Sequence, residues 1–194
     1  MYSAIKVMLQ TCLKKKTLQS TTTAVRKQKY GDNDMQISEE GKQLIKKFEG
    51  CPTDGDMAVS YRCAANVPTI GYGSTRYKGK PVKDGMKISM QDADNLLAEE
   101  LHEYESHIKN MVKVPVSENQ FSALVAWCFN IGPSAAKGSS AIRLLNEQKY
   151  DEVPKSMKLW NKATVNGEKV VLEGLVRRRE AEALLYEGKE WHEV

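Results

Sequence analysis

A single stretch decides the fold of this chain: Val67-Pro68-Thr69-Ile70-Gly71-Tyr72-Gly73-Ser74-Thr75. Within it, residues that favour strands are interrupted by two glycines, which predicts a short strand that runs into a tight turn. The alternation of Val59, Tyr61 and Cys63 predicts its partner strand, and the residues 64–66 suit the turn between the two. A third short strand is expected around residues 80–82. This part of the sequence therefore predicts a small β-hairpin region.

Helix signals lie on both sides of this β region. Ser38 followed by two glutamates marks a helix start, and Gly50 marks its end. A capping pattern at Ser89 opens a long amphipathic helix of about 23 residues, which ends before Pro115. Further helices are expected from Ser117 and over residues 140–148, 152–160 and 175–186, with a hairpin turn at Asn166-Gly167. The order predicts an α+β fold in which one long helix joins a small β lobe to a larger helical lobe, with a cleft between them.

Charge is distributed unevenly along the 194 residues. Residues 1–34 hold seven Lys or Arg and two Asp, whereas the rest holds 22 basic and 23 acidic residues. We expect residues 1–34 to be a basic flexible tail and residues 35–194 to be the folded catalytic domain. Three other interpretations of this segment stay open: it is a transit peptide, it binds an anionic surface, or the protein truly starts at Met35. The near-neutral domain argues against nucleic-acid binding, and no apolar run reaches the roughly 18 residues of a bilayer-spanning helix, so stable membrane insertion is not expected.

Metal and cofactor motifs are missing from the sequence. There is no phosphate-binding glycine loop, no H-E-x-x-H zinc motif and no G-x-S-x-G nucleophile motif. No pair of cysteines has C-x-x-C spacing, and His102 and His107 are five apart, which does not place them on one helix face. We therefore expect no metal, no cofactor and free thiols, with oxidation inactivating the protein only if Cys51 and Cys63 can pair.

Glu49 is the most informative acidic residue. It comes directly before the helix-ending Gly50, where the negative end of the helix disfavours a charged carboxylate. A carboxyl group that keeps its proton near neutral pH is what general-acid catalysis requires. The alternative is a solvated surface glutamate, and position alone does not decide between the two.

Several separated motifs resemble one enzyme family. The stretch 67–75 is similar to the β-hairpin signature of the phage-type lysozymes, glycoside hydrolase family 24. Other matching segments follow the family's order: Leu44 to Cys51, Asn119 to Val125, Phe129 to Gly132, Trp160 to Ala163 and Gly174 to Glu182. The resemblance covers about residues 37–187 and implies a lysozyme-like fold.

This resemblance also implies a catalytic set. The family uses a Glu, then an Asp or Cys, then a Thr, which correspond here to Glu49, Cys63 and Thr69. Cys63 comes fourteen residues after Glu49, about five more than the family's usual spacing, so a longer loop is expected between helix and hairpin. An alternative is that Asp54 or Asp56 in this insertion supplies a second carboxylate to the cleft.

The roles that follow are those of a muramidase, an enzyme that hydrolyses the β-1,4 bond between N-acetylmuramic acid and N-acetylglucosamine in bacterial peptidoglycan. Glu49 would donate the proton, Thr69 would position the attacking water and Cys63 would shape the water site, with inversion at the anomeric carbon. Asn130 is a candidate to bind an N-acetyl group. Of the arginines 177–179, one is expected to pair with an acid near the cleft and the others to be solvated.

The resemblance further implies a phage endolysin that causes host cell lysis. It would be a monomer made in the host cytoplasm, which reaches the cell wall after a separate holin permeabilises the membrane. Three alternatives remain: a catalytically silent peptidoglycan-binding module, because Cys63 stands in the Asp place; a lytic transglycosylase, which needs the acid but no water-activating base; and a surface binder that acts through its basic tail.

Overall fold

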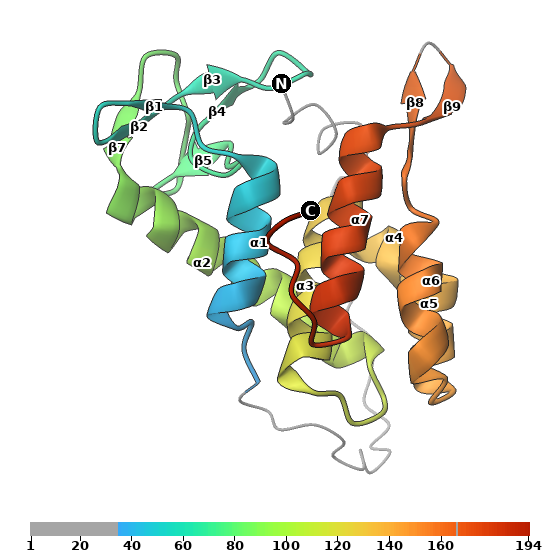
Figure 1. Ribbon diagram of the computed structural model, residues 1–194. Helices are drawn as coiled ribbons and strands as arrows, with labels where there is room; N and C mark the ends of the chain where they lie inside the picture. Colours follow the sequence, from blue (N-terminus) through green and yellow to red (C-terminus); the bar gives the residue numbers. More distant parts are fainter. Residues whose placement is uncertain (1–34, 166) are drawn as a thin grey trace, which may run out of the picture.

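The computed structural model describes residues 35–165 and 167–194, so the predicted tail over residues 1–34 lies outside the described residues (Figure 1). The helices are α1 Glu39–Glu49, α2 Met90–Met111, α3 Glu118–Ile131, α4 Pro133–Lys137, α5 Ser140–Asn146, α6 Val153–Lys158 and α7 Glu173–Tyr186, with a 3-10 turn at Tyr150–Glu152. The strands are β1 Thr53–Asp54, β2 Met57–Val59, β3 Tyr61–Arg62, β4 Pro68–Thr69, β5 Arg76–Tyr77, β6 Lys80–Pro81, β7 Lys87–Ser89, β8 Lys162–Val165 and β9 Glu168–Val171. The predicted α+β class is confirmed.

The β lobe consists of three small antiparallel sheets. One has the strand order β1-β2-β7, and the others are the pairs β3-β4 and β5-β6. The single strand expected over residues 59–63 is wrong: Ser60 separates β2 from β3, and its backbone N–H donates to Met86 O at 2.8 Å. The expected longer loop after α1 is a hairpin, in which Thr53 pairs with Ala58 around a turn at Gly55.

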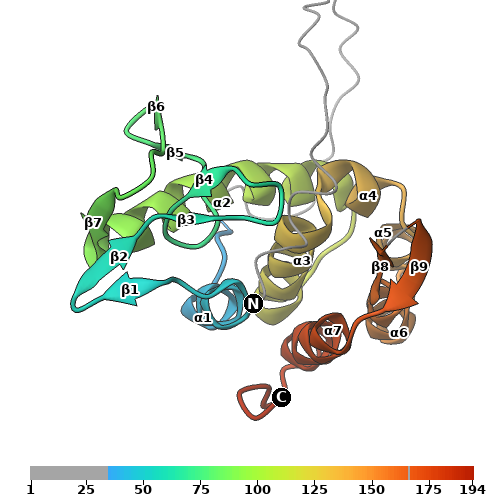
Figure 2. The same cartoon turned by 90° about the horizontal axis from the view of Figure 1, so that it is seen from above.

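Helix α2 joins the two lobes, as predicted. Its first turn is capped by the Ser89 hydroxyl, which accepts a hydrogen bond from the Asp92 N–H at 3.0 Å. Figures 1 and 2 show the helix running from the β lobe along the helical lobe. Its apolar side chains are buried in the shared core: Ala93, Leu97, Leu101 and Ile108. The apolar residues that recur with the 3.6-residue period of a helix therefore lie on the face of α2 that packs against the core.

The helical lobe is built around α3. Ser117 and Gln120 form the predicted capping box at its start, and every residue from Phe121 to Ile131 is buried. Helices α1, α2 and α7 pack around it. Full burial of a large apolar side chain stabilises a fold by about 1.5–3 kcal/mol, so α3 is the centre of the core. The short helix α4, which was not predicted, follows immediately after Gly132.

A polar contact fixes α1 against the β lobe. Asp94 in α2 forms an ion pair with Lys46 of α1 at 2.8 Å and accepts a hydrogen bond from the Tyr72 hydroxyl at 3.1 Å. Tyr72 belongs to the stretch that decides the fold, and Ile70, two residues earlier, is fully buried. These contacts therefore fix the position of the end of α1 relative to the β3-β4 hairpin.

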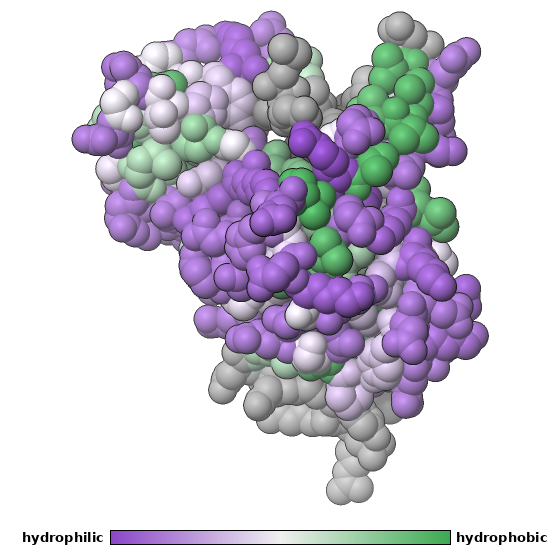
Figure 3. Space-filling model, in the orientation of Figure 1, coloured by the Kyte–Doolittle hydropathy of each residue, from purple (hydrophilic) through white to green (hydrophobic). Residues whose placement is uncertain are grey.

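The described surface is mostly hydrophilic, with an apolar patch on the β8-β9 hairpin (Figure 3). Val165, Val170 and Val171 are exposed there, and Leu159 is exposed just before it. The hairpin was predicted from its central turn, in which Gly167 has φ 87°. Within residues 35–165 and 167–194, no helix has the length and hydropathy needed to cross a bilayer.

Candidate active site

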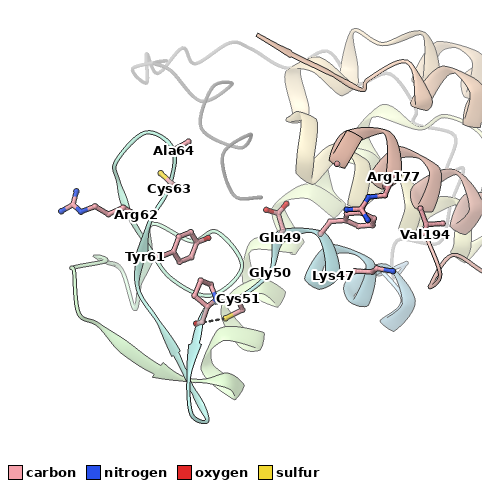
Figure 4. Close-up of a pocket in the computed structure, with 13 residues that line it drawn as sticks. Lys47, Glu49, Gly50, Cys51, Tyr61, Arg62, Cys63, Ala64, Arg177 and Val194 are labelled. Carbon is pink, nitrogen blue, oxygen red and sulfur yellow. Dashed lines mark hydrogen bonds between the residues drawn. The ribbon is translucent and has the colours of Figure 1, made fainter. Parts of the chain in front are cut away.

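A cavity of about 550 Å³ lies between the two lobes. Its walls come from the end of α1 and the following loop, from β3 and its turn, and from the first turn of α7 (Figure 4). The lining residues are Lys47, Phe48, Glu49, Gly50, Cys51, Pro52, Tyr61, Arg62, Cys63, Ala64, Gly174, Arg177 and Val194. The cleft predicted between the lobes is therefore present, and among the described residues Glu49 is the single acidic side chain in this lining.

Glu49 is the last residue of α1, and the chain turns away directly after it. Gly50 ends the helix with φ 68°, a left-handed value that favours glycine. Figure 4 shows Glu49 between Cys63 of the hairpin and Arg177 of α7. The residue is only 8% exposed, so the alternative of a solvated surface glutamate is wrong.

Arg178 of α7 holds the Glu49 carboxylate. Its Nη1 donates to Glu49 Oε1 at 2.8 Å, and its Nε donates to Glu182 Oε1 at 3.1 Å. The expectation that one of the three arginines pairs with an acid near the cleft is confirmed. A buried carboxylate paired in this way has a fixed position, which general-acid catalysis requires.

Arg179 is also buried, which corrects the expectation that it is solvated. Its Nη2 donates to Glu182 Oε1 at 2.7 Å and to Asn130 Oδ1 at 2.9 Å. Arg177 is exposed and lines the cavity. Glu49, Arg178, Arg179 and Glu182 form what we call the buried charge cluster: two acids and two bases, each with a side chain no more than 5% exposed.

The ionisation of this cluster follows from burial and mutual attraction. Burial alone would lower the pKa of Arg178, but the charges of Glu49 and Glu182 raise it above its ordinary value. Burial lowers the pKa of Arg179 to about 10. Burial raises the pKa of Glu182, and the guanidinium groups of Arg179 and Arg178 act against that increase.

The cluster was not predicted from sequence. Arg178 and Glu182 are four apart, and Arg179 and Glu182 three apart, so helical periodicity alone places both arginines beside this acid. That spacing was the available signal, but it does not distinguish a buried pair from a solvated one.

Cys63 lies across the cavity from Glu49. It follows β3 directly, is 7% exposed and lines the cavity. Its N–H donates to Val67 O at 3.1 Å, and its carbonyl accepts from the Asn66 N–H at 2.8 Å. Two backbone bonds therefore fix the turn that presents this thiol to the cavity.

Thr69 lies on β4, where it pairs with Tyr61 of β3. It is 2% exposed and is not part of the cavity lining, although its partner Tyr61 is. Its hydroxyl donates to Val67 O at 3.0 Å. The structure thus brings Glu49 and Cys63 into one cavity and places Thr69 one strand behind it.

The remaining candidates lie elsewhere. Asp54 forms an exposed ion pair with Lys87 at 2.6 Å, and neither it nor Asp56 lines the cavity. Asn130 is buried outside the lining and binds Arg179 through Oδ1, so its substrate role stays a prediction. Cys51 and Cys63 both line the cavity as free thiols, and in the described part of the chain no group of three metal-binding side chains is present.

Comparison with known proteins identifies the family to which this chain belongs. The family model for phage lysozymes matches residues 46–182. The chain belongs to the phage lysozyme family. It is 35% identical over 154 residues to the endolysin of Acyrthosiphon pisum secondary endosymbiont phage 1, an alignment that covers 79% of this chain and 99% of that protein.

Two solved structures support this assignment. The endolysin from Escherichia coli O157:H7 phage FAHEc1 superposes with a TM-score of 0.73 at 39% identity, over 79% of this chain and 94% of that one. The muramidase domain of SpmX from Asticaccaulis excentricus superposes with a TM-score of 0.69 at 36% identity, over 78% and 97%. The lysozyme-like fold is confirmed, and the chain is a peptidoglycan-hydrolysing lysozyme, a glycoside hydrolase.

Proposed function

We propose that this lysozyme hydrolyses the β-1,4 bond between N-acetylmuramic acid and N-acetylglucosamine, with Glu49 as the proton donor. The observation that carries the proposal is the place of Glu49: a buried carboxyl group, held by Arg178, and the single acidic side chain in the described lining of a cavity between two lobes. Breaking a glycosidic bond requires a proton on the leaving oxygen. Glu49 is the side chain in this lining that can supply it.

The second half of the reaction needs water on the opposite face of the sugar. A retaining mechanism uses a second side-chain carboxylate as nucleophile, and the described cavity lining holds none. An inverting enzyme also uses a second carboxylate, as base for the water, so the lining alone does not select the outcome. We propose direct attack by water with inversion at the anomeric carbon because the family resemblance implies it.

Thr69 is the residue that would orient this water. Its hydroxyl hydrogen is committed to Val67 O at 3.0 Å, so the oxygen lone pairs are left to accept a hydrogen bond. Cys63, whose thiol borders the cavity, would limit where that water can sit.

The biological role that fits best is that of an endolysin. Relatives with this name support cytolysis of a bacterial host, and peptidoglycan is the partner the enzyme requires. We propose that residues 35–194 are the catalytic domain and act as a monomer. We further propose that the chain is made in the host cytoplasm and reaches the wall after a holin permeabilises the membrane.

Product analysis tests the reaction class. Purified murein is digested in water enriched in oxygen-18, and the sugar ends are identified by mass spectrometry. Hydrolysis predicts reducing N-acetylmuramic acid ends that carry one heavy oxygen. Anhydro ends without the label would show a transglycosylase instead, and binding without any cleavage would show a silent peptidoglycan-binding module.

A further inference from the structure

The buried charge cluster extends well beyond the contact that Glu49 needs. Arg178 divides its donors between Glu49 and Glu182, at 2.8 and 3.1 Å. Glu182 Oε1 also accepts from Arg179 at 2.7 Å, and Arg179 reaches Asn130 at 2.9 Å. A continuous chain of polar contacts thus runs from the cavity into the core behind it.

Stability does not account for this arrangement. Transferring charges from water into a protein interior costs several kcal/mol per ion, and well-packed apolar residues in their place are often as stabilising or more so. Glu182 has no exposed side-chain surface and does not line the cavity. Any effect of Glu182 on the reaction must therefore act through the buried charge cluster, in which it contacts both Arg178 and Arg179.

The charge balance indicates what that effect is. With Glu49 ionised, the two acids and two arginines of the cluster sum to zero, and with Glu49 protonated they sum to +1. Without the charge of Glu182 these sums become +1 and +2. Because uncompensated buried charge is unfavourable, loss of Glu182 favours the ionised form of Glu49.

We propose that Glu182 is a positioning residue which balances Arg178 and Arg179, so that Glu49 keeps its proton until the glycosidic bond breaks. This inference rests on the proposed role of Glu49 as proton donor. Glu182 would orient Arg178 by accepting the hydrogen bond from Arg178 Nε. Its negative charge would also offset part of the positive charge of the two arginines, which otherwise favours the ionised form of Glu49.

Other charged or titratable groups line the same cavity or interact with Glu49, and the test leaves them unchanged. They come from α1 and its following loop, the hairpin, α2 and α7: Lys47, Cys51, Arg62, Cys63, Tyr104 and Arg177. Only variants that change the buried cluster itself can then isolate the effect of Glu182.

The test is the pH dependence of kcat/KM for murein clearing. Deprotonation of the general acid sets the alkaline limb of this profile. Glu182→Gln keeps an oxygen for the bonds from Arg178 Nε and Arg179 Nη2 but removes the charge and the contact of Oε2 with Arg179 Nε at 2.7 Å. The limb is then expected to move to lower pH by about one unit. Glu182→Asp keeps the charge and is expected to hold the limb at its wild-type position even if the rate falls.

Two further variants make the test independent of packing. Arg179→Gln removes a positive charge from the same cluster and is expected to move the limb in the opposite direction, to higher pH. The double variant, which combines Glu182→Gln with Arg179→Gln, is expected to return the alkaline limb close to its wild-type position. The matched control is Glu180→Gln, which removes an acid from the same helix at a half-exposed position paired with Lys158, and which is expected to leave the limb in place.

The outcomes separate this inference from the proposed function. A wild-type protein that does not cleave murein at any pH contradicts the proposed function itself. If the wild type cleaves murein and folded Glu182→Gln has its alkaline limb at the same pH, the role of Glu182 is overturned. A shift of equal size in Glu180→Gln also overturns it, since the effect would then be one of overall charge. If Glu182→Gln does not fold, an unmoved limb in Arg179→Gln overturns the role of Glu182 in its place.

Discussion

The two walls of the cavity are held in different ways. The helical wall consists of Glu49 and the α7 side chains behind it, and charged side chains fix it through bonds of 2.7 to 3.1 Å. The hairpin wall, residues 61–69, is fixed by the β3-β4 pairing, by the backbone turn bonds of Cys63 and by the exposed Arg62 side chain, which donates to Asn66 O at 2.6 Å. The side chains that it contributes for catalysis are a thiol and a hydroxyl rather than a carboxylate.

This difference teaches how the two halves of the reaction are prepared. A proton donor needs a controlled electrostatic environment, which a network of buried charges provides. A water site needs a fixed shape, which the tight turn provides through its backbone bonds and the Arg62 contact at its exposed edge. The two walls should therefore respond differently to substitution, the first to changes in charge and the second to changes in backbone conformation.

Removal of the central cation should give the largest loss of stability. Arg178→Leu takes away the guanidinium that holds Glu49 and leaves Glu182 with Arg179 alone in the interior. Breaking a buried pair on one side destabilises a protein by about 3–5 kcal/mol. We expect a loss of that size in the free energy of unfolding, measured by urea denaturation.

The matched control for this variant is Arg143→Leu. Arg143 is 60% exposed and pairs with Glu147 one turn along α5, at 2.9 Å. Such surface pairs contribute about 0.3–0.5 kcal/mol. Equal losses in the two variants would contradict the account of the helical wall as an interdependent charge network.

A backbone change should affect the hairpin wall by an intermediate amount. Asn66 has φ 62°, a left-handed conformation that asparagine tolerates and a β-branched residue does not. Asn66→Val is expected to lower stability by about 1–2 kcal/mol and to reduce murein clearing, because the turn also positions Cys63. Asn66→Gly fits the same conformation, so its clearing rate should stay close to wild type; if it falls as far as that of Asn66→Val, the effect lies in the lost side chain.

A change of side-chain chemistry at Cys63 should have a smaller effect. The resemblance implies that either Asp or Cys is accepted at this position, and the turn that presents the thiol to the cavity is held by backbone bonds. Cys63→Asp is therefore expected to keep the turn and to retain or raise the clearing rate of purified murein. Complete loss of clearing in a folded variant would show that the thiol has a specific role.

The smallest effect concerns a thiol away from both walls. Cys128 is fully buried in α3, and burial raises its pKa to about 12. At pH 8 it should remain a neutral thiol and stay unlabelled by iodoacetamide, because the thiolate is the reactive form. Peptide mass spectrometry measures this directly, with labelling in denaturant as the control. Rapid labelling of native Cys128 would show that the core around α3 opens readily.

The sequence predicted best those elements that carry local signals. Ser38, Ser89 and Ser117 each mark a helix start within one residue of the observed position, because an N-cap requires a specific side chain at a specific place. The hairpin turn before β9 was also predicted. The strands β1, β5 and β7 were not, since two or three residues give too short a pattern to recognise.

Two of the predicted site residues lie in one cavity, whereas the specific contacts that hold the first of them were not predicted from sequence. Glu49 and Cys63 line one cavity, but nothing local distinguishes Arg179, which is buried, from Arg177, which is exposed. That distinction depends on which face of α7 packs against α3, and hence on tertiary contacts between residues 49 positions apart, such as Arg179 and Asn130. Sequence periodicity describes a helix face but does not say what covers it.

The most direct test of the central claim is the clearing rate of Glu49→Gln against wild type, with Glu39→Gln as the control at the exposed start of the same helix. General-acid catalysis contributes about 10²- to 10⁴-fold to a rate. We predict a loss within or beyond that range for Glu49→Gln, with an unchanged circular dichroism spectrum and no comparable loss for Glu39→Gln. A folded Glu49→Gln protein that clears murein at the wild-type rate would contradict the account.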